Sequence, residues 1–363
     1  MNVKKVPAVS MVILLAGLWF AAFGGVSEGA EPVKITDGTG RVFEYTQPTE
    51  RIVTMGYAST LTVAMLGEID KIIAVDTYST YDYTHDERLK DLDAANMGSI
   101  YTASNNDKIM TQFLQWVEGG KMSLDDTIVL TTYSNANLLR DQLNDAGFNY
   151  VLVYLSVTSY GGVVDFVRSM SIIVTGEVSS IVDDMELVKT TIDERLIGVT
   201  NKAKGMGVWY STSLGLQVNN TGSISVSLID SAGGLNVAYN PSVSAARYGD
   251  SSTIIQMVDR NPDVVIFLSD TYTLSHSVSD FRNTLLGGKD VSVVIVDSAW
   301  NNYCPDAAEG LWAFACALYP DLFEGPAPRT DESSEPEVLP YAAVGFVAVV
   351  FTAGMAYFFL RRP

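Results

Sequence analysis

The stretch "VVDFVRSMSIIVTGEVSSIVDDMELVKTTIDERL" (Val163–Leu196) carries the longest helical pattern in the chain. Apolar side chains recur every three or four residues from its first position to its last. This period is typical of an amphipathic α-helix, and at 1.5 Å per residue the run would extend about 50 Å. Gly176 lies near its middle and could kink the helix or divide it in two. We expect one long linking helix over residues 161–198.

Short apolar runs alternate with helical patterns on both sides of this stretch. A hairpin is expected at 33–45, and the other predicted strands are 51–55, 71–75, 127–132, 149–155, 205–212, 263–269 and 291–296. The predicted helices are 59–66, 135–147, 227–234, 252–260, 278–288 and 307–319. This alternation predicts parallel α/β sheets. We therefore expect an α/β fold of two Rossmann-like lobes, 31–160 and 199–324, joined by the linking helix.

Two apolar segments frame the predicted lobes. Lys4 and Lys5 precede the apolar run 6–23, which predicts a signal peptide over residues 1–30, with an uncleaved anchor as the alternative. Residues 341–360 carry no charge and are long enough to span a bilayer as a transmembrane helix. The arginines that follow place the C-terminus in the cytoplasm. The proline-rich, acidic residues 325–340 read as an extended stalk. The sequence thus predicts a single-pass protein on the extracellular face of the membrane.

The net charge of the chain narrows the classes of partner. The formal net charge of −19 argues against nucleic acid as a partner, because a phosphate backbone requires clustered Lys and Arg.

Cys304 and Cys316 are the only cysteines. If the stretch between them is helical, the two residues are too far apart for a disulfide, so we expect free thiols. The alternative is that this stretch is not helical.

Five stretches resemble the substrate-binding proteins of iron-siderophore, haem and cobalamin ABC importers. They are "ITDGTGRVFEYTQPTERIV" (35–53), "LGEIDKIIAVD" (66–76), "SAGGLNVA" (231–238), "NPDVVIFL" (261–268) and "EGLWAFACALYPDLF" (309–323). The resemblance implies a monomeric, archaeal-type, membrane-anchored member that captures a metal chelate between its lobes and passes it to an ABC permease. The family usually places a permease-docking glutamate in the first helix of each lobe. Leu61 and Ile255 stand at those positions here.

The stretch "VDTYSTYDYTHD" (75–86), which begins the loop after the predicted strand 71–75, suggests where a ligand would bind. In an open parallel sheet, ligands lie beyond the carboxyl ends of the strands, and aromatic or polar side chains follow nearly every predicted strand. The candidate ligand-binding residues are Tyr57, Tyr78, Tyr81, Tyr83, His85, Tyr101, Tyr210, Tyr272, Trp300 and Asn301.

These residue types indicate the chemistry of the ligand. Aromatic faces and amide groups suit a flat or bulky conjugated molecule such as a ferric siderophore, haem or a corrinoid. Because the proposed loops contain almost no arginine, a neutral or cationic chelate such as a corrinoid is favoured. The only two histidines, His85 and His276, are too few for a bare metal site built from imidazole. They could bridge opposed loops or be exposed loop histidines.

The leading hypothesis is therefore a binding protein without enzymatic activity or a cofactor of its own. A surface sensory or adhesion ectodomain on the same scaffold, without transporter docking, is the alternative. An envelope enzyme is disfavoured because the sequence shows no recognisable nucleophile or metal cluster.

Overall fold

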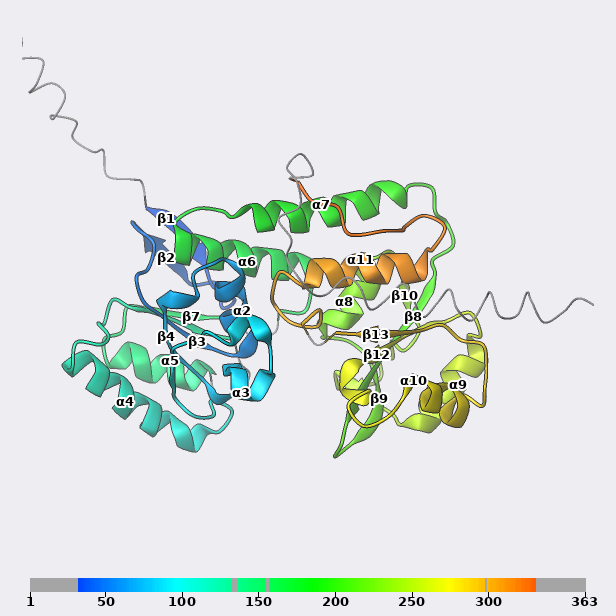
Figure 1. Ribbon diagram of the computed structural model, residues 1–363, viewed down its shortest axis with the longest axis horizontal. Helices are drawn as coiled ribbons and strands as arrows, with labels where there is room; N and C mark the ends of the chain where they lie inside the picture. Colours follow the sequence, from blue (N-terminus) through cyan, green and yellow to red (C-terminus); the bar gives the residue numbers. More distant parts are fainter. Residues whose placement is uncertain (1–31, 132–135, 155–156, 298, 331–363) are drawn as a thin grey trace, which may run out of the picture. The chain divides into compact units, whose positions relative to one another are not determined.

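The computed structural model describes residues 32–131, 136–154, 157–297 and 299–330 (Figure 1). The predicted signal peptide and the predicted span at 341–360 lie outside these ranges. Among the helices within them, none combines the length and the apolar character needed to cross a membrane.

The first lobe is built on a five-stranded, wholly parallel sheet, as predicted. Its strand order is β5-β4-β3-β6-β7. The hairpin β1–β2 forms a separate two-stranded sheet. The strands are β1 (Val33–Thr36), β2 (Val42–Tyr45), β3 (Ile52–Met55), β4 (Ile72–Val75), β5 (Ala95–Asn96), β6 (Thr127–Leu130) and β7 (Tyr150–Val153). The helices are α2 (Tyr57–Met65), α3 (Tyr81–Thr84), α4 (Asn106–Glu118) and α5 (Ala136–Asp145). Helix α4 was not predicted from the sequence.

The second lobe contains a mixed sheet, so the prediction of a parallel sheet is wrong at one edge. The order is β11-β9-β8-β12-β13, with β10 paired to β8. The strands are β8 (Lys204–Ser211), β9 (Gly215–Asn219), β10 (Leu235–Asn236), β11 (Arg247–Tyr248), β12 (Val265–Ser269) and β13 (Val293–Val296). Strand β9 is antiparallel to both β8 and β11. Three residues connect β8 to β9, and only antiparallel strands can be joined by so short a loop.

Four helices complete this lobe. They are α8 (Ile224–Ser231), α9 (Ser251–Arg260), the short α10 (Val278–Asp280) and α11 (Ala307–Leu318). A π-helical turn, Phe281–Leu285, follows α10 directly. The predicted helices at 227–234, 252–260 and 307–319 are confirmed, with ends that differ by a few residues.

The prediction of one long linking helix is wrong, because the chain divides at Gly176 into α6 (Tyr160–Thr175) and α7 (Ser180–Arg195). Gly176 ends α6 in the left-handed conformation, with φ +85°, which glycine adopts without steric cost. Ser179 then caps α7 by accepting a hydrogen bond from the Ile181 N–H. Helix α7 packs against both α6 and α11 (Figure 1). The apolar period continues across the break because both helices bury an apolar face.

The helical hairpin α6–α7 lies within a core that belongs to both lobes. One apolar cluster includes Phe43 of the hairpin β1–β2, Phe166 of α6, Met185 of α7, Leu228 of α8 and Phe314 of α11. The remaining face of each sheet is covered by a separate cluster. The lobes are therefore joined by shared packing as well as by the chain itself.

We predict that Gly176→Ala destabilises the protein and that Gly161→Ala does not. At Gly176 a Cβ would meet Pro48 Cδ at 3.3 Å in a left-handed backbone, so we expect a loss of about 1–2 kcal/mol in the free energy of unfolding. At Gly161 in the first turn of α6, a Cβ would meet nothing within 4 Å. Alanine there should be neutral or stabilise by up to about 1 kcal/mol. Urea unfolding of both variants measures the difference, and equal stabilities would contradict the assigned break.

Candidate functional site

The loops at the carboxyl ends of the two sheets meet each other. In the first lobe, α2 follows β3, and its Thr62 Oγ1 donates a hydrogen bond of 3.2 Å to the Tyr303 carbonyl of the second lobe. Beside this bond, buried Leu61 packs with Ala299 and Cys304, which follow β13. Side chains carried beyond the strand ends of either sheet therefore lie near the junction of the lobes.

A hydrogen-bonded charge network crosses this junction. Arg88, which follows β4, donates to both carboxylate oxygens of Asp86 at 2.9 and 2.8 Å. Its Nη1 donates to Oδ2 of Asp306, in the second lobe, at 2.6 Å. The Tyr57 hydroxyl donates to Oδ2 of Asp86 at 2.5 Å. The network thus joins α2 and the loop after β4 in the first lobe to the loop before α11 in the second.

Burial and charge act on these groups in opposite directions. Burial alone would raise the pKa of Asp86, but hydrogen bonds from Arg88 and Tyr57 hold it below its ordinary value. Burial raises the pKa of Asp306, although Arg88 opposes the rise. The pKa of the Tyr57 hydroxyl is raised by burial and by its bond to Asp86. Asp86 is consequently the carboxylate that the network stabilises most clearly.

Three predicted residues form a tyrosine cluster in the first lobe. The Tyr78 ring lies edge-on to Tyr83, with centroids 4.9 Å apart, and to Tyr101, at 4.7 Å. Tyr83 is 57% exposed and Tyr101 is 45% exposed. Tyr81 and His85, at a centroid distance of 6.2 Å, form a neighbouring pair at α3. This first tyrosine cluster (Tyr78, Tyr83 and Tyr101) presents aromatic surface to solvent.

A buried aspartate positions the turn that carries Tyr78. Asp76 follows β4 directly and is fully buried. It accepts hydrogen bonds from the Gly56 N–H at 3.0 Å, from the Tyr78 N–H at 3.3 Å, and from the Ser79 hydroxyl. Burial raises the pKa of this carboxyl, and its three donors oppose the rise. Asp76 therefore fixes the loops after β3 and β4 against each other.

A second aromatic cluster lies at the strand ends of the second lobe. Tyr210, at the end of β8, lies 5.3 Å from both Tyr272 and His276 between ring centroids. Tyr272 and His276 stack at 4.6 Å with an interplanar angle of 18°. Leu214 and Leu274, from the neighbouring loops, are 66% and 86% exposed. Exposed apolar side chains thus occur in the same loops as the second aromatic cluster (Tyr210, Tyr272 and His276).

Two of the predicted ligand-binding residues pack inside the second lobe. Asn301 Oδ1 accepts a 2.8 Å hydrogen bond from the Ser225 N–H in the first turn of α8. Trp300 packs closely on α11, because a Cβ at Gly310 would lie 2.7 Å from the Trp300 Cβ. Trp300 and Asn301 therefore position helices. Tyr57 is likewise held by Asp86, and a ligand role for the ten residues stays a prediction.

Sequence reasoning missed the residues that connect the lobes. Arg88 and Asp306 are separated by 218 positions in the chain, and no local pattern pairs them. His276 was considered only as a bridging or exposed histidine, although its place four residues after Tyr272 gave a signal for stacking. Leu61, at the position where the resemblance places a docking glutamate, is 0% exposed and packs against the second lobe. Ile255 on α9 is partly exposed.

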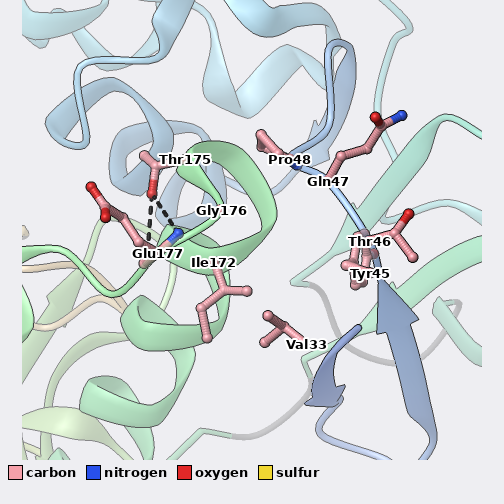
Figure 2. Close-up of a pocket in the computed structure, with 9 residues that line it drawn as sticks. All are labelled: Val33, Tyr45, Thr46, Gln47, Pro48, Ile172, Thr175, Gly176 and Glu177. Carbon is pink, nitrogen blue, oxygen red and sulfur yellow. Dashed lines mark hydrogen bonds between the residues drawn. The ribbon is translucent and has the colours of Figure 1, made fainter. Parts of the chain in front are cut away.

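A separate pocket of about 300 Å³ lies between the hairpin β1–β2 and the end of α6. Figure 2 shows the Thr175 hydroxyl hydrogen-bonded to the backbone of Glu177 at its edge. The lining residues are Val33, Tyr45, Thr46, Gln47, Pro48, Ile172, Thr175, Gly176 and Glu177. The pocket shares no residue with either aromatic cluster.

The thiols and the acidic side chains show no metal site within the described ranges. Cys304 and Cys316 are both free, as predicted. No group of three or more His, Cys, Asp or Glu side chains among the described residues is arranged to hold a metal ion.

The structure is similar to those of periplasmic binding proteins. No family model matches the sequence, and no curated protein matches it either. Helicobacter pylori CeuE in complex with nickel and histidine aligns with a TM-score of 0.57 at 17% identity, covering 80% of this chain and 90% of that one. The periplasmic haem-binding protein RhuT from Roseiflexus sp. RS-1 aligns with a TM-score of 0.55 at 16% identity, covering 75% and 98%.

A third neighbour extends the range of ligands. The periplasmic vitamin B12-binding protein BtuF of Vibrio cholerae aligns with a TM-score of 0.53 at 17% identity, covering 75% of this chain and 97% of that one. These neighbours are binding proteins rather than enzymes. At such identities the likeness establishes the fold, so the chain has the two-lobe α/β fold of the binding proteins of ABC transporters.

We predict that Asn301→Ala lowers the free energy of unfolding by about 1 kcal/mol, because the Ser225 N–H loses its side-chain acceptor. Asn301→Asp is the matched control, since a carboxylate keeps the acceptor and favours a helix N-terminus. Urea unfolding of the three proteins measures both effects. An alanine variant as stable as the parent would show that Asn301 does not act as a cap.

Proposed function

We propose that the protein is an extracytoplasmic substrate-binding protein that captures a small molecule between its lobes and delivers it to an ABC permease. The observation that carries this proposal is the pair of aromatic clusters, one beyond the strand ends of each sheet. The contact between Thr62 and Tyr303 brings these two sets of strand ends toward each other. Ligands of open α/β sheets bind at such ends.

The ligand class that these clusters favour is a metal chelate with a flat or bulky conjugated face. Tyrosine and histidine rings offer large apolar faces together with polar atoms that can direct hydrogen bonds. All three guanidinium nitrogens of Arg88 are already bonded to Asp86 and Asp306. Because two carboxylates already neutralise this guanidinium and the proposed loops contain almost no other arginine, a neutral or cationic chelate such as a corrinoid is favoured over an acidic siderophore.

The proposed location follows from the terminal segments of the sequence. A signal peptide at 1–30 and a span at 341–360 would place the lobes on the extracellular face of the membrane, with a stalk at 325–340 and a cytoplasmic C-terminus. An archaeal-type anchored, monomeric binding protein combines these features. We further propose the lobe boundaries 31–160 and 199–324 as its functional units.

A surface sensory or adhesion ectodomain is the second candidate. It is favoured by the two docking positions, because Leu61 is buried between the lobes and Ile255 is apolar. Neither can supply the carboxylate that the family uses to pair with a permease arginine.

Thermal unfolding of the purified protein against haem, cobalamin, cobinamide and ferric siderophores tests the proposal. A true ligand at about a hundred times its Kd adds roughly 2.7 kcal/mol to the free energy of unfolding, which raises the midpoint by a few degrees. A shift with one chelate class supports a substrate-binding protein. A folded, ligand-free protein that shifts with none of them supports the sensory or adhesion ectodomain.

We predict that Tyr101→Ala and Tyr210→Ala each weaken binding of the chelate found in that screen by about tenfold, as loss of one aromatic contact removes about 1.4 kcal/mol. Titration followed by fluorescence quenching measures the affinities. The control is Tyr239→Ala, which removes a 61% exposed tyrosine outside both clusters. Equal affinities for the three variants and the parent would remove the clusters from the binding site.

A further inference from the structure

We propose that Arg88 and Asp306 form a latch that holds the two lobes together before any ligand binds. Asp86 and Tyr57 of the first lobe complete this interlobe latch. Arg88 donates to Asp86 through Nε and Nη2 and to Asp306 through Nη1. The latch is a property of the protein alone, and only its role in ligand capture rests on the proposed function.

The geometry of the latch is that of a strong ion pair. The side chain of Asp86 is 11% exposed and that of Asp306 is 12% exposed, whereas the Arg88 side chain is 40% exposed. A guanidinium bound through two nitrogens to one carboxylate is held in a fixed orientation, so Nη1 points to the second carboxylate without further ordering. By contrast, Arg140 pairs with the neighbouring Asp141, which is 61% exposed, inside a single helix. The Arg140 side chain is 18% exposed, but its partner is solvated and belongs to the same helix, so this pair contributes little and does not join the lobes.

Each partner of Arg88 is fixed by its own lobe. Asp86 also accepts the Tyr57 hydroxyl and the Arg88 N–H. Asp306 lies at the position that precedes α11, where the N-terminal end of the helix dipole stabilises a negative charge. Removal of Arg88 would leave two neighbouring, largely buried carboxylates without their cation. Separation of the lobes, which hydrates both carboxylates, would then be favoured.

An apolar contact beside the latch provides a way to detect that separation. Leu61 of the first lobe covers Ala299 and Cys304 of the second, and the Cys304 side chain is 0% exposed. Its Sγ–H donates to the Ala299 carbonyl at 3.2 Å. A reagent in solution can therefore reach this thiol only when the lobes part or the protein unfolds.

The experiment is the rate of Cys304 alkylation by iodoacetamide in the full chain, without ligand. Cys316→Ala makes Cys304 the only thiol, since the chain has two cysteines. In this background Arg88→Gln should react at least about tenfold faster, the factor expected when charge-assisted hydrogen bonds across the junction are lost. Asp306→Asn should also react faster, and the double variant should show less than the product of the two effects because both remove one interaction. Arg140→Gln is the matched control and should react at the parent rate.

Electrostatic effects on the thiol do not mimic the expected result for Arg88→Gln, whereas loss of the Asp306 charge, which raises the pKa of Cys304, would itself speed alkylation. The charge of Arg88 lowers the pKa of the Cys304 thiol, against a larger rise caused by burial. Loss of Arg88 would raise this pKa and slow alkylation in the closed protein. Faster reaction of Arg88→Gln therefore reports opening.

Two outcomes would overturn the latch. One is an alkylation rate for Arg88→Gln within twofold of the parent. The other is a faster rate that depends on urea as steeply as global unfolding does, since local opening depends on urea only weakly. Because the assay uses no ligand, failure of the latch is distinct from failure of the ligand screen. A weak urea dependence with a tenfold faster rate supports the latch.

Discussion

The architecture depends on one continuous apolar core that passes from the first lobe through α6 and α7 into the second. Phe166 and Met185 lie in the same cluster as Phe43 on one side and Phe314 on the other. The Tyr160 N–H also donates to Ser227 of α8 at 2.8 Å. Rotation of one lobe against the other would therefore disrupt close packing, which proteins resist. This core sets the distance and orientation at which the two sheets present their strand ends.

Much of this arrangement could be predicted from the sequence, because it depends on local signals. Short apolar runs gave β3, β4, β6, β7, β8, β12 and β13, and helical periods gave α2, α5, α8, α9 and α11. The break at Gly176 was visible as one of two alternatives, but the apolar period on both sides made a single helix equally consistent. The antiparallel strand β9 was missed since its apolar residues are few, and a glycine in the left-handed region, Gly215 at φ +71°, begins it.

The candidate site was also predictable from the sequence only in part. The rule that ligands lie beyond strand ends named Tyr78, Tyr101, Tyr210 and Tyr272, and the structure brings Tyr78 against Tyr101 and Tyr210 against Tyr272. It also named Asn301, whose side chain instead caps α8. Residue type alone cannot separate these roles, since an amide suits a ligand and a helix end equally well. The bond between Arg88 and Asp306 could not be foreseen, because it depends on how two lobes pack.

The core and the charge network constrain different motions. Packing of α6 and α7 opposes rotation at the side of the molecule where the lobes share their helices, whereas Arg88 acts at the strand ends, where a ligand would enter. A hinge built only on the core would leave the lobes free to separate at those ends. A charge pair there can be broken at moderate cost, because both carboxylates regain water when the lobes part. The apolar core and the proposed latch thus have different roles, a permanent hinge and a polar contact that can open, and Tyr78 and Tyr83 of the first tyrosine cluster lie in the same loop as Arg88.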